Sequence, residues 1–102
     1  MADPVTRTQK GRVALLAIDN PPVNGLGFAV RQALQRQVTA ALADPATAAI
    51  VIAGRGRMLS GGADIREFGK PQQEPILPQV LAVIEAADKP VVAAIHGHAL
   101  GG

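Results

Sequence analysis

The chain has 102 residues, 48% of them apolar, which suffices for one small domain with a hydrophobic core. The formal net charge of +2 and the aromatic content of 2% indicate neither an electrostatic surface for nucleic acid nor a stacking platform for bases. The sequence lacks cysteine, which excludes a disulfide framework, a cysteine nucleophile and a thiolate metal site, and is consistent with a reducing compartment.

The sequence also indicates neither a metal site nor a membrane segment. Two histidines, His96 and His98, cannot form a metal site alone, so we expect no metal. No apolar run approaches the roughly 18 residues of a membrane span, and the N-terminus lacks the apolar core of a secretory signal. We expect a cytoplasmic or organelle-matrix protein. Residues 1–10 are predicted to be a flexible N-terminus, followed by one structured region over residues 11–102.

The first half of the chain predicts a strand and a helix. Residues 13–18 are a continuous apolar run, typical of a strand covered on both faces. The prolines and asparagines of the DNPPVNG segment then predict a turn. From residue 28 apolar side chains recur every three or four positions, while Arg31 and Arg36 fall on the polar side. This amphipathic helix should end at Asp44-Pro45, because the residue before proline disfavours helical geometry.

The second half predicts two more strands around a long loop and a helix. Residues 48–53 form another apolar run, and the glycine-rich residues 54–75 that follow are longer than a loop without a function usually is. Residues 77–84 predict a helix and residues 91–95 a third strand. This order predicts a parallel sheet with right-handed β-α-β crossovers. Its edges would be uncovered, so we expect the chain to be a fragment.

The glycine segment after the second strand matches no common phosphate or nucleophile motif. A P-loop would need Lys and Ser at positions 62 and 63, where glycine and alanine stand. A dinucleotide fingerprint would need glycine at position 59, and a nucleophile elbow would need it at position 58. Neither position is glycine, so Ser60 is predicted to be a turn or cap residue.

Backbone amides are the remaining candidates for chemistry. Both glycine turns follow parallel strands, so they should open into one crevice at the carboxyl ends of the sheet. The SGGADIREF segment places glycines before an expected helix start, where amides are free and the helix dipole is positive. The final ALGG segment is a second turn of small residues. Two N–H groups from separate loops that converge on one oxygen would form an oxyanion hole.

Three separated motifs, PPVN, SGGADIREF and KPVVAAIHGHALGG, occur in an order that resembles the enoyl-CoA hydratase/isomerase (crotonase) family. The resemblance runs from Val13 to Gly102 and covers the N-terminal part, under half, of a family domain. It is closest to the hydratase region of bifunctional fatty-acid oxidation enzymes, which carry a 3-hydroxyacyl-CoA dehydrogenase region downstream. The resemblance implies a crotonase-like α/β fold, incomplete in this chain.

The same resemblance implies the roles of individual residues. The backbone N–H groups of Ala63 and Gly102 would form the oxyanion hole around the thioester oxygen of an acyl-CoA. Further residues would border the CoA moiety on two sides, and they are Pro22, Val23, Asn24, Gly62, Asp64, Ile65 and Arg66. The acid/base glutamates of the family come after the last glycine turn and are absent here, so the fragment alone should bind rather than catalyse.

Simpler roles compete with some of these. Asp64 is predicted to stabilise free amides near a helix start rather than to act as a catalytic carboxylate, and Glu67 to face solvent. Arg55, Arg57 and Arg66 could contact CoA phosphates or simply be solvated. The two histidines are predicted to pack or to hydrogen-bond in their turn rather than to act as a general base.

The implied function is 2-enoyl-CoA hydration in fatty-acid β-oxidation, with enoyl-CoA isomerisation left open. Alternatives are a thioester hydrolase or pure isomerase of the family, a noncatalytic CoA- or nucleotide-binding module, and a fragment that does not fold alone. The hydratase part would need no cofactor, and NAD would be needed only by a downstream dehydrogenase region. We expect a small-molecule acyl-CoA as partner, no nucleic acid and no membrane, with self-association through the missing C-terminal part left open. A bacterial cytoplasm is the expected location, with peroxisome and mitochondrial matrix as alternatives.

Overall fold

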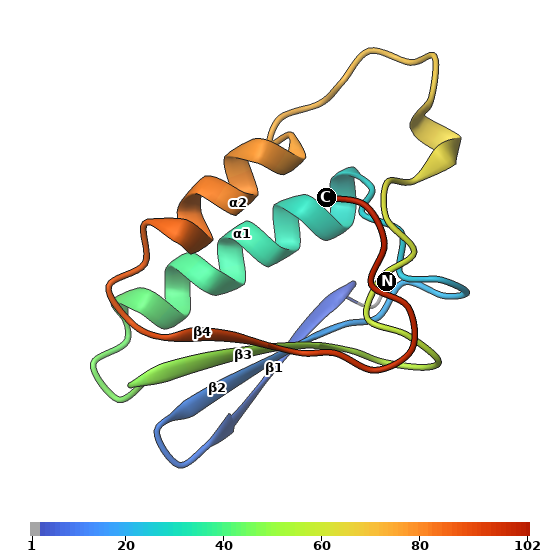
Figure 1. Ribbon diagram of the computed structural model, residues 1–102. Helices are drawn as coiled ribbons and strands as arrows, with labels where there is room; N and C mark the ends of the chain where they lie inside the picture. The colour runs from blue at the N-terminus through green and yellow to red at the C-terminus, as the bar shows by residue number, and fades with distance from the viewer. Residues whose placement is uncertain (1–2) are drawn as a thin grey trace.

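Two helices lie across one face of a four-stranded sheet in the computed structural model, which describes residues 3–102 (Figure 1). The elements in chain order are β1 Val5–Lys10, β2 Val13–Ile18, α1 Phe28–Ala43, β3 Ala49–Gly54, the single 3₁₀ turn η1 Ile65–Glu67, α2 Leu77–Glu85 and β4 Val91–Ala94.

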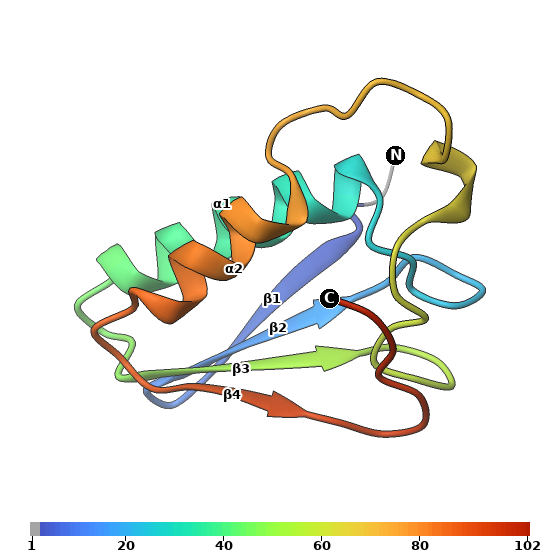
Figure 2. The same ribbon diagram turned by 45° about the horizontal axis from the view of Figure 1, so that its top comes forward.

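The strands follow one another across the sheet in the order β1-β2-β3-β4. β2, β3 and β4 pair in parallel, as the apolar runs predicted, whereas β1 pairs antiparallel to β2. Each of the crossovers β2-α1-β3 and β3-α2-β4 leads to the next strand on the same side. Because parallel crossovers share one hand, α1 and α2 must lie on the same face of the sheet. Figure 2 shows both helices on that face, with the carboxyl ends of the parallel strands at one end of the sheet.

The N-terminal segment differs from its prediction. Val5–Lys10 is a strand rather than part of a flexible terminus, and Val5 is fully buried. A two-residue connection joins β1 to β2, and Gly11 within it has a φ of 59°, the left-handed conformation that tight hairpins favour. The rest of the flexible segment predicted for residues 1–10 includes Met1 and Ala2, which lie outside the described residues.

The core lies between the sheet and α1. Ala14, Leu16 and Ile18 alternate along β2 and are buried in one cluster with the apolar stripe of α1. Val13 and Leu15, on the opposite face of β2, are only half-buried, so this strand is not covered on both faces within residues 3–102. The predicted stripe of α1 is confirmed, and the helix ends at Ala43 before Pro45. The core therefore packs β1, β2 and β3 against the helices beneath the loops at the carboxyl end of the sheet.

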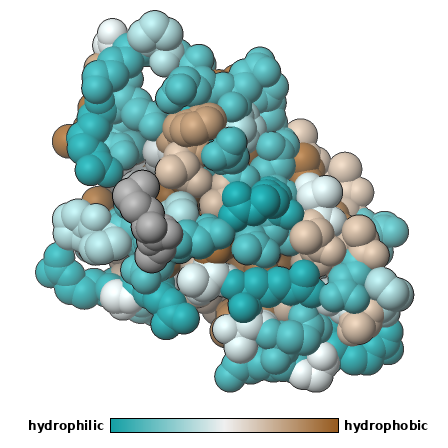
Figure 3. Space-filling model, turned by 180° about the vertical axis from the view of Figure 1, so that it is seen from behind, coloured by the Kyte–Doolittle hydropathy of each residue, from teal (hydrophilic) through white to brown (hydrophobic). Residues whose placement is uncertain are grey.

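Exposure increases towards β4. Val92, Ile95 and Leu100 are large apolar residues with more than half of their surface exposed. By contrast, much of the surface on the side opposite to Figure 1 is hydrophilic (Figure 3). The apolar surface around β4 and its following turn is thus an unusual feature of the fold.

Candidate functional site

The two glycine turns lie against each other at the carboxyl ends of β3 and β4. Ser60 and Ala99 form an isolated parallel bridge between them. The Ser60 N–H donates to the carbonyl oxygen of His98 at 3.2 Å, and the Leu100 N–H donates to the carbonyl oxygen of Ser60 at 3.0 Å. The expectation that both turns open at one edge of the sheet is therefore confirmed.

Glycine is required where these turns touch. Gly62 has a φ of 95°, and a Cβ on it would lie 2.8 Å from the carbonyl oxygen of Leu100. A Cβ on Gly97 would collide with the carbonyl oxygen of Arg57. Because both obstacles are backbone oxygens, a side chain could not be accommodated by a rotamer change.

The Gly62–Ala63 peptide is held through its carbonyl group, and the peptide before it is held through its N–H. The Gly62 carbonyl oxygen accepts from the Leu26 N–H at 2.8 Å, and the Gly62 N–H, which belongs to the Gly61–Gly62 peptide, donates to Ser60 Oγ at 3.0 Å. In a planar trans peptide the C=O and the following N–H point in opposite directions, so this carbonyl bond also sets the direction of the Ala63 N–H. Within residues 3–102 the Ala63 N–H donates to no acceptor, and it remains available.

The last turn brings glycines beside this amide. A Cβ on Gly101 would lie 3.9 Å from the Ala63 nitrogen, and a Cβ on Gly102 would collide with the side chain of Leu77. Gly102 lines an apolar cavity of about 350 Å³ between α2 and the sheet. Ala63 lines a neighbouring cavity of about 250 Å³, and Leu26 and Leu77 line both. Ala63 and Gly102 are thus brought to the same end of the molecule, at adjoining cavities.

A third cavity, of about 310 Å³, collects most of the residues expected to border CoA. Pro22, Val23, Asp64, Ile65 and Arg66 line it together with Ala63. Gly62 lies behind it in contact with the last turn.

Asn24 differs from the other residues of this predicted set. Only 3% of its surface is exposed. Its side-chain amide donates to the carbonyl oxygens of Arg55 at 2.9 Å and Met58 at 3.0 Å, and Asn24 Oδ1 accepts from the Asn20 N–H at 2.9 Å. The side chain therefore holds two loops together and does not face the cavity.

Asp64 and Arg66 form a local pair at the cavity rim. Asp64 caps η1 by accepting the Arg66 N–H at 3.0 Å, as predicted for an acidic residue near a helix start. Its carboxylate also accepts from the Arg66 guanidinium at 2.9 and 2.8 Å. That hydrogen bond lowers the pKa of Asp64 and raises the pKa of Arg66. Arg66 is thus held beside the cavity as a fixed positive charge.

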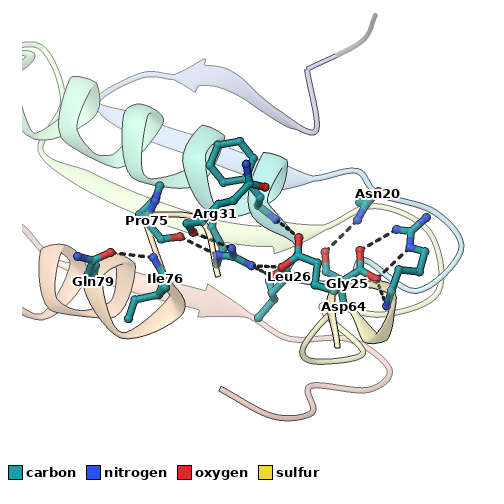
Figure 4. A network of polar contacts seen from close by, with 12 residues as sticks. Asn20, Gly25, Leu26, Arg31, Asp64, Pro75, Ile76 and Gln79 are labelled. Atoms are coloured by element: carbon teal, nitrogen blue, oxygen red, sulfur yellow. Dashed lines mark hydrogen bonds and ion pairs between the residues drawn. The ribbon is translucent and has the colours of Figure 1, made fainter. Parts of the chain in front are cut away.

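The prediction for Arg31 is wrong, and that for Glu67 is only partly right. The sequence predicts Arg31 on the polar side of the helix, but it is buried, and its guanidinium donates to Glu67 Oε1 at 2.9 Å (Figure 4). Glu67, predicted to face solvent, has 39% of its side chain exposed, but Glu67 Oε2 accepts from the Phe28 N–H at 2.7 Å. The hydrogen bond from Arg31 lowers the pKa of Glu67 most, and the hydrogen bond from the Phe28 N–H lowers it further. The sequence held one indication of this contact. Gly27, the N-terminal cap residue of α1, has no side chain to accept from the first amides of the helix, so an acceptor from elsewhere was to be expected.

Two smaller predictions concern the turns themselves. Ser60 Oγ accepts from the Gly62 N–H two residues on at 3.0 Å, as predicted for a turn or cap residue, and it also donates to the Asn24 carbonyl oxygen at 2.9 Å. His96 Nε2 lies 2.8 Å from the carbonyl oxygen of Gly56, which agrees with a hydrogen-bonding role. Among residues 3–102, no cluster of three or more metal-ligating side chains occurs, and no helix is long and apolar enough to cross a membrane.

Comparison with known proteins identifies the class to which this fold and these turns belong. The family model for enoyl-CoA hydratase/isomerase matches residues 8–102. The chain belongs to this family.

Particular relatives agree with that assignment. The chain is 53% identical over 93 residues to a peroxisomal bifunctional enzyme of Danio rerio, covering 91% of this chain and 13% of the relative. It is 40% identical over 97 residues to a probable enoyl-CoA hydratase of Bacillus subtilis, covering 88% of this chain and 38% of the relative. The chain thus spans less than half the length of these relatives.

Solved structures confirm the crotonase-like fold. A probable enoyl-CoA hydratase/isomerase from Mycobacterium abscessus is 28% identical with a TM-score of 0.78, and 95% of this chain matches 39% of that one. An enoyl-CoA hydratase/carnithine racemase from Magnetospirillum magneticum has a TM-score of 0.88 at 24% identity, and 99% of this chain matches 42% of that one. At that identity the second likeness concerns the fold alone.

Proposed function

We propose that this chain is the N-terminal part of an enoyl-CoA hydratase of fatty-acid β-oxidation, with Ala63 and Gly102 as its oxyanion hole. The observation that carries the proposal is the held Gly62–Ala63 peptide, whose free N–H lies beside the last glycine turn. The relatives named as bifunctional enzymes and hydratases support the same chemistry.

The reaction would proceed through an enolate. When water adds across the 2,3 double bond of an enoyl-CoA, negative charge grows on the thioester oxygen, and two fixed N–H groups would stabilise it. Loss of one such donor typically costs about 3 kcal/mol of barrier. Isomerisation would use the same enolate after an α-proton leaves.

The cavities supply places for the two parts of an acyl-CoA. The apolar cavity of about 350 Å³ suits an acyl chain, since its lining is largely aliphatic. The cavity at Pro22, Val23 and Ile65 would take the CoA moiety, with the Arg66 guanidinium available for a phosphate.

Proton transfer would need groups from elsewhere in the protein. Glu67 is the carboxylate nearest in sequence to Asp64, but both of its oxygens already accept hydrogen bonds. Asp64 is paired with Arg66. We therefore propose that the acid/base glutamates lie in a longer polypeptide, and that these residues alone bind without turnover.

The exposed apolar residues around β4 support a longer polypeptide, because further chain or a second copy could cover them. No cofactor is proposed for hydration itself, and NAD would be required only by a dehydrogenase region of the kind that a bifunctional protein carries. The relatives named as peroxisomal favour a peroxisomal location, and a bacterial cytoplasm stays a prediction from the sequence.

The test measures hydration of crotonyl-CoA by the full-length protein and binding of CoA by the 102-residue chain. We expect loss of absorbance from the enoyl thioester with the full-length protein, and CoA binding without turnover by the chain. Hydrolysis to free CoA would instead identify a thioester hydrolase, and binding without any turnover by the full-length protein would identify a noncatalytic module.

A further inference from the structure

We infer that Arg31 is a positioning residue that holds the Ala63 amide in its oxyanion-binding orientation. The inference rests on the proposed function, because it concerns the same amide. Arg31, on α1, lines the cavity of about 250 Å³ together with Ala63, but neither the apolar cavity proposed for the acyl chain nor the cavity proposed for CoA.

Arg31 lies at a junction of four segments. Nε donates to the carbonyl oxygen of Pro75 at 2.7 Å, and Nη2 donates to that of Gln73 at 3.1 Å. Nη1 donates to the Leu26 carbonyl oxygen at 2.8 Å and to Glu67 Oε1 at 2.9 Å. Figure 4 shows the guanidinium at the centre of this network. Only the planar fork of an arginine can satisfy acceptors in these several directions at once.

One branch of this network reaches the Ala63 peptide through Leu26. Arg31 Nη1 donates to the Leu26 carbonyl oxygen, which holds Leu26 on one side of its Cα, and on the other side the Leu26 N–H donates to the Gly62 carbonyl oxygen at 2.8 Å. Because the Gly62–Ala63 peptide is planar, rotation of its carbonyl away from Leu26 would rotate the Ala63 N–H by the same angle.

The other branch holds the chain on the far side of Ala63. Glu67 bonds both to Arg31 and to the Phe28 N–H at the start of α1. The Glu67 N–H donates to the Asp64 carbonyl at 3.0 Å, so the η1 turn moves as a unit with this carboxylate. Ala63 is therefore anchored to α1 both before and after its own position.

A purely structural role for Arg31 makes a different prediction. Arg31→Met leaves Glu67 and three backbone carbonyl oxygens without their donor, so it should lower stability whichever role Arg31 has. If Arg31 only filled space, Arg31→Met would leave the properties of a bound thioester unchanged. If it orients the amide, the thioester carbonyl should report the change.

The experiment uses the full-length protein and butyryl-CoA labelled with ¹³C at the thioester carbonyl, a saturated ligand that cannot be hydrated. Hydrogen bonds to this oxygen lower its infrared stretching frequency. We expect Arg31→Met to lose at least half of the shift seen in the unsubstituted protein, while affinity for free CoA changes less than about twofold. Turnover of crotonyl-CoA should fall by about 10- to 100-fold, short of the full loss of one donor.

Arg31→Lys should recover part of the shift, because it restores the charge but not the fork. Arg36→Met is the matched control, since Arg36 lies on the same helix and, among residues 3–102, its ion pair is with Asp3 at the exposed surface. It should leave the carbonyl frequency and turnover unchanged.

Each result decides the inference. A folded Arg31→Met protein with the unsubstituted carbonyl frequency would overturn it, and the proposed function would stand. If Arg31→Met does not fold, the infrared frequency of the thioester carbonyl is measured in Arg31→Lys and Glu67→Gln instead. If both variants give the frequency of the unsubstituted protein, the inference is overturned. If the unsubstituted protein binds butyryl-CoA without a shift, the proposed function fails and the inference falls with it.

Discussion

Gly62 lies so close to Leu100 that a Cβ on the glycine would be 2.8 Å from the leucine carbonyl oxygen. This contact joins the two turns that carry the candidate amides. It is also the place where one added carbon atom would push the turns apart, since neither partner can move a side chain out of the way.

Gly62→Ala should therefore weaken acyl-CoA binding by the full-length protein by at least about tenfold, equivalent to about 1.4 kcal/mol. Gly56→Ala is the matched control, because Gly56 also has a positive φ, 81°, but a Cβ there meets nothing within 4 Å. Both variants pay a backbone cost of about 1–2 kcal/mol for a left-handed alanine. Titration calorimetry with butyryl-CoA should show the affinity loss only for Gly62→Ala, and equal losses would contradict the contact argument.

Glu67 predicts a pH-dependent contribution to stability. Arg31 and the Phe28 N–H lower the pKa of Glu67 from its usual 4.5. A carboxylate with a depressed pKa in the folded state contributes stability that is present above pH 4.5 and lost as the pH falls through the folded pKa. Since 39% of the Glu67 side chain is exposed, the contribution is about 1 kcal/mol rather than the value of a fully buried pair.

Denaturant unfolding of Glu67→Gln at two pH values checks this. The variant should be less stable than the unsubstituted protein by about 1 kcal/mol at pH 7, with the difference shrinking below pH 4.5. Glu85→Gln, at an exposed position at the end of α2, serves as the control for the loss of one carboxylate. A Glu67→Gln difference that is constant with pH would exclude an ionic origin.

The sequence predicts most of this fold but not all of it, for identifiable reasons. The sequence predicts β2, β3 and α1 because burial requires apolar residues in continuous runs or at periodic spacing. The sequence does not predict β1, because this edge strand has a single fully buried residue, Val5, and its composition is that of a polar chain terminus. Only the glycine of its tight hairpin signalled it.

The candidate site divides in the same way. The glycine turns could be placed at one edge of the sheet from strand order alone, whereas the roles of Ala63 and Gly102 came from a family resemblance. The Arg31–Glu67 pair could not be found by local pattern, because its members are 36 residues apart and meet only through the fold. Asn24 was assigned to the ligand because its loop matches, but the direction of a side chain is decided by tertiary contacts.

Replacing Arg66 should weaken ligand binding without lowering the stability of the fold. Its side chain is 72% exposed, and the pair with Asp64 is therefore worth little to folding. We expect Arg66→Gln to lower CoA affinity about fivefold at low salt, and the loss to shrink as salt is added. Arg12→Gln, in the exposed hairpin between β1 and β2, is the control of equal charge change. Equal losses in both variants would show a nonspecific charge effect.

Replacing Asn24 should lower the stability of the fold, in contrast to replacing Arg66. Its buried amide satisfies the carbonyl oxygens of Arg55 and Met58, and its φ of 52° is one that alanine adopts with difficulty. Asn24→Gly removes the buried side chain with its hydrogen bonds but adds no backbone strain and should cost about 2 kcal/mol, whereas Asn24→Ala adds about 1 kcal/mol of backbone strain. Chemical denaturation of the full-length protein measures both. If Asn24→Ala were no less stable than Asn24→Gly, the left-handed backbone would not be a constraint, and if neither lost stability, the two loops would be held together by other contacts.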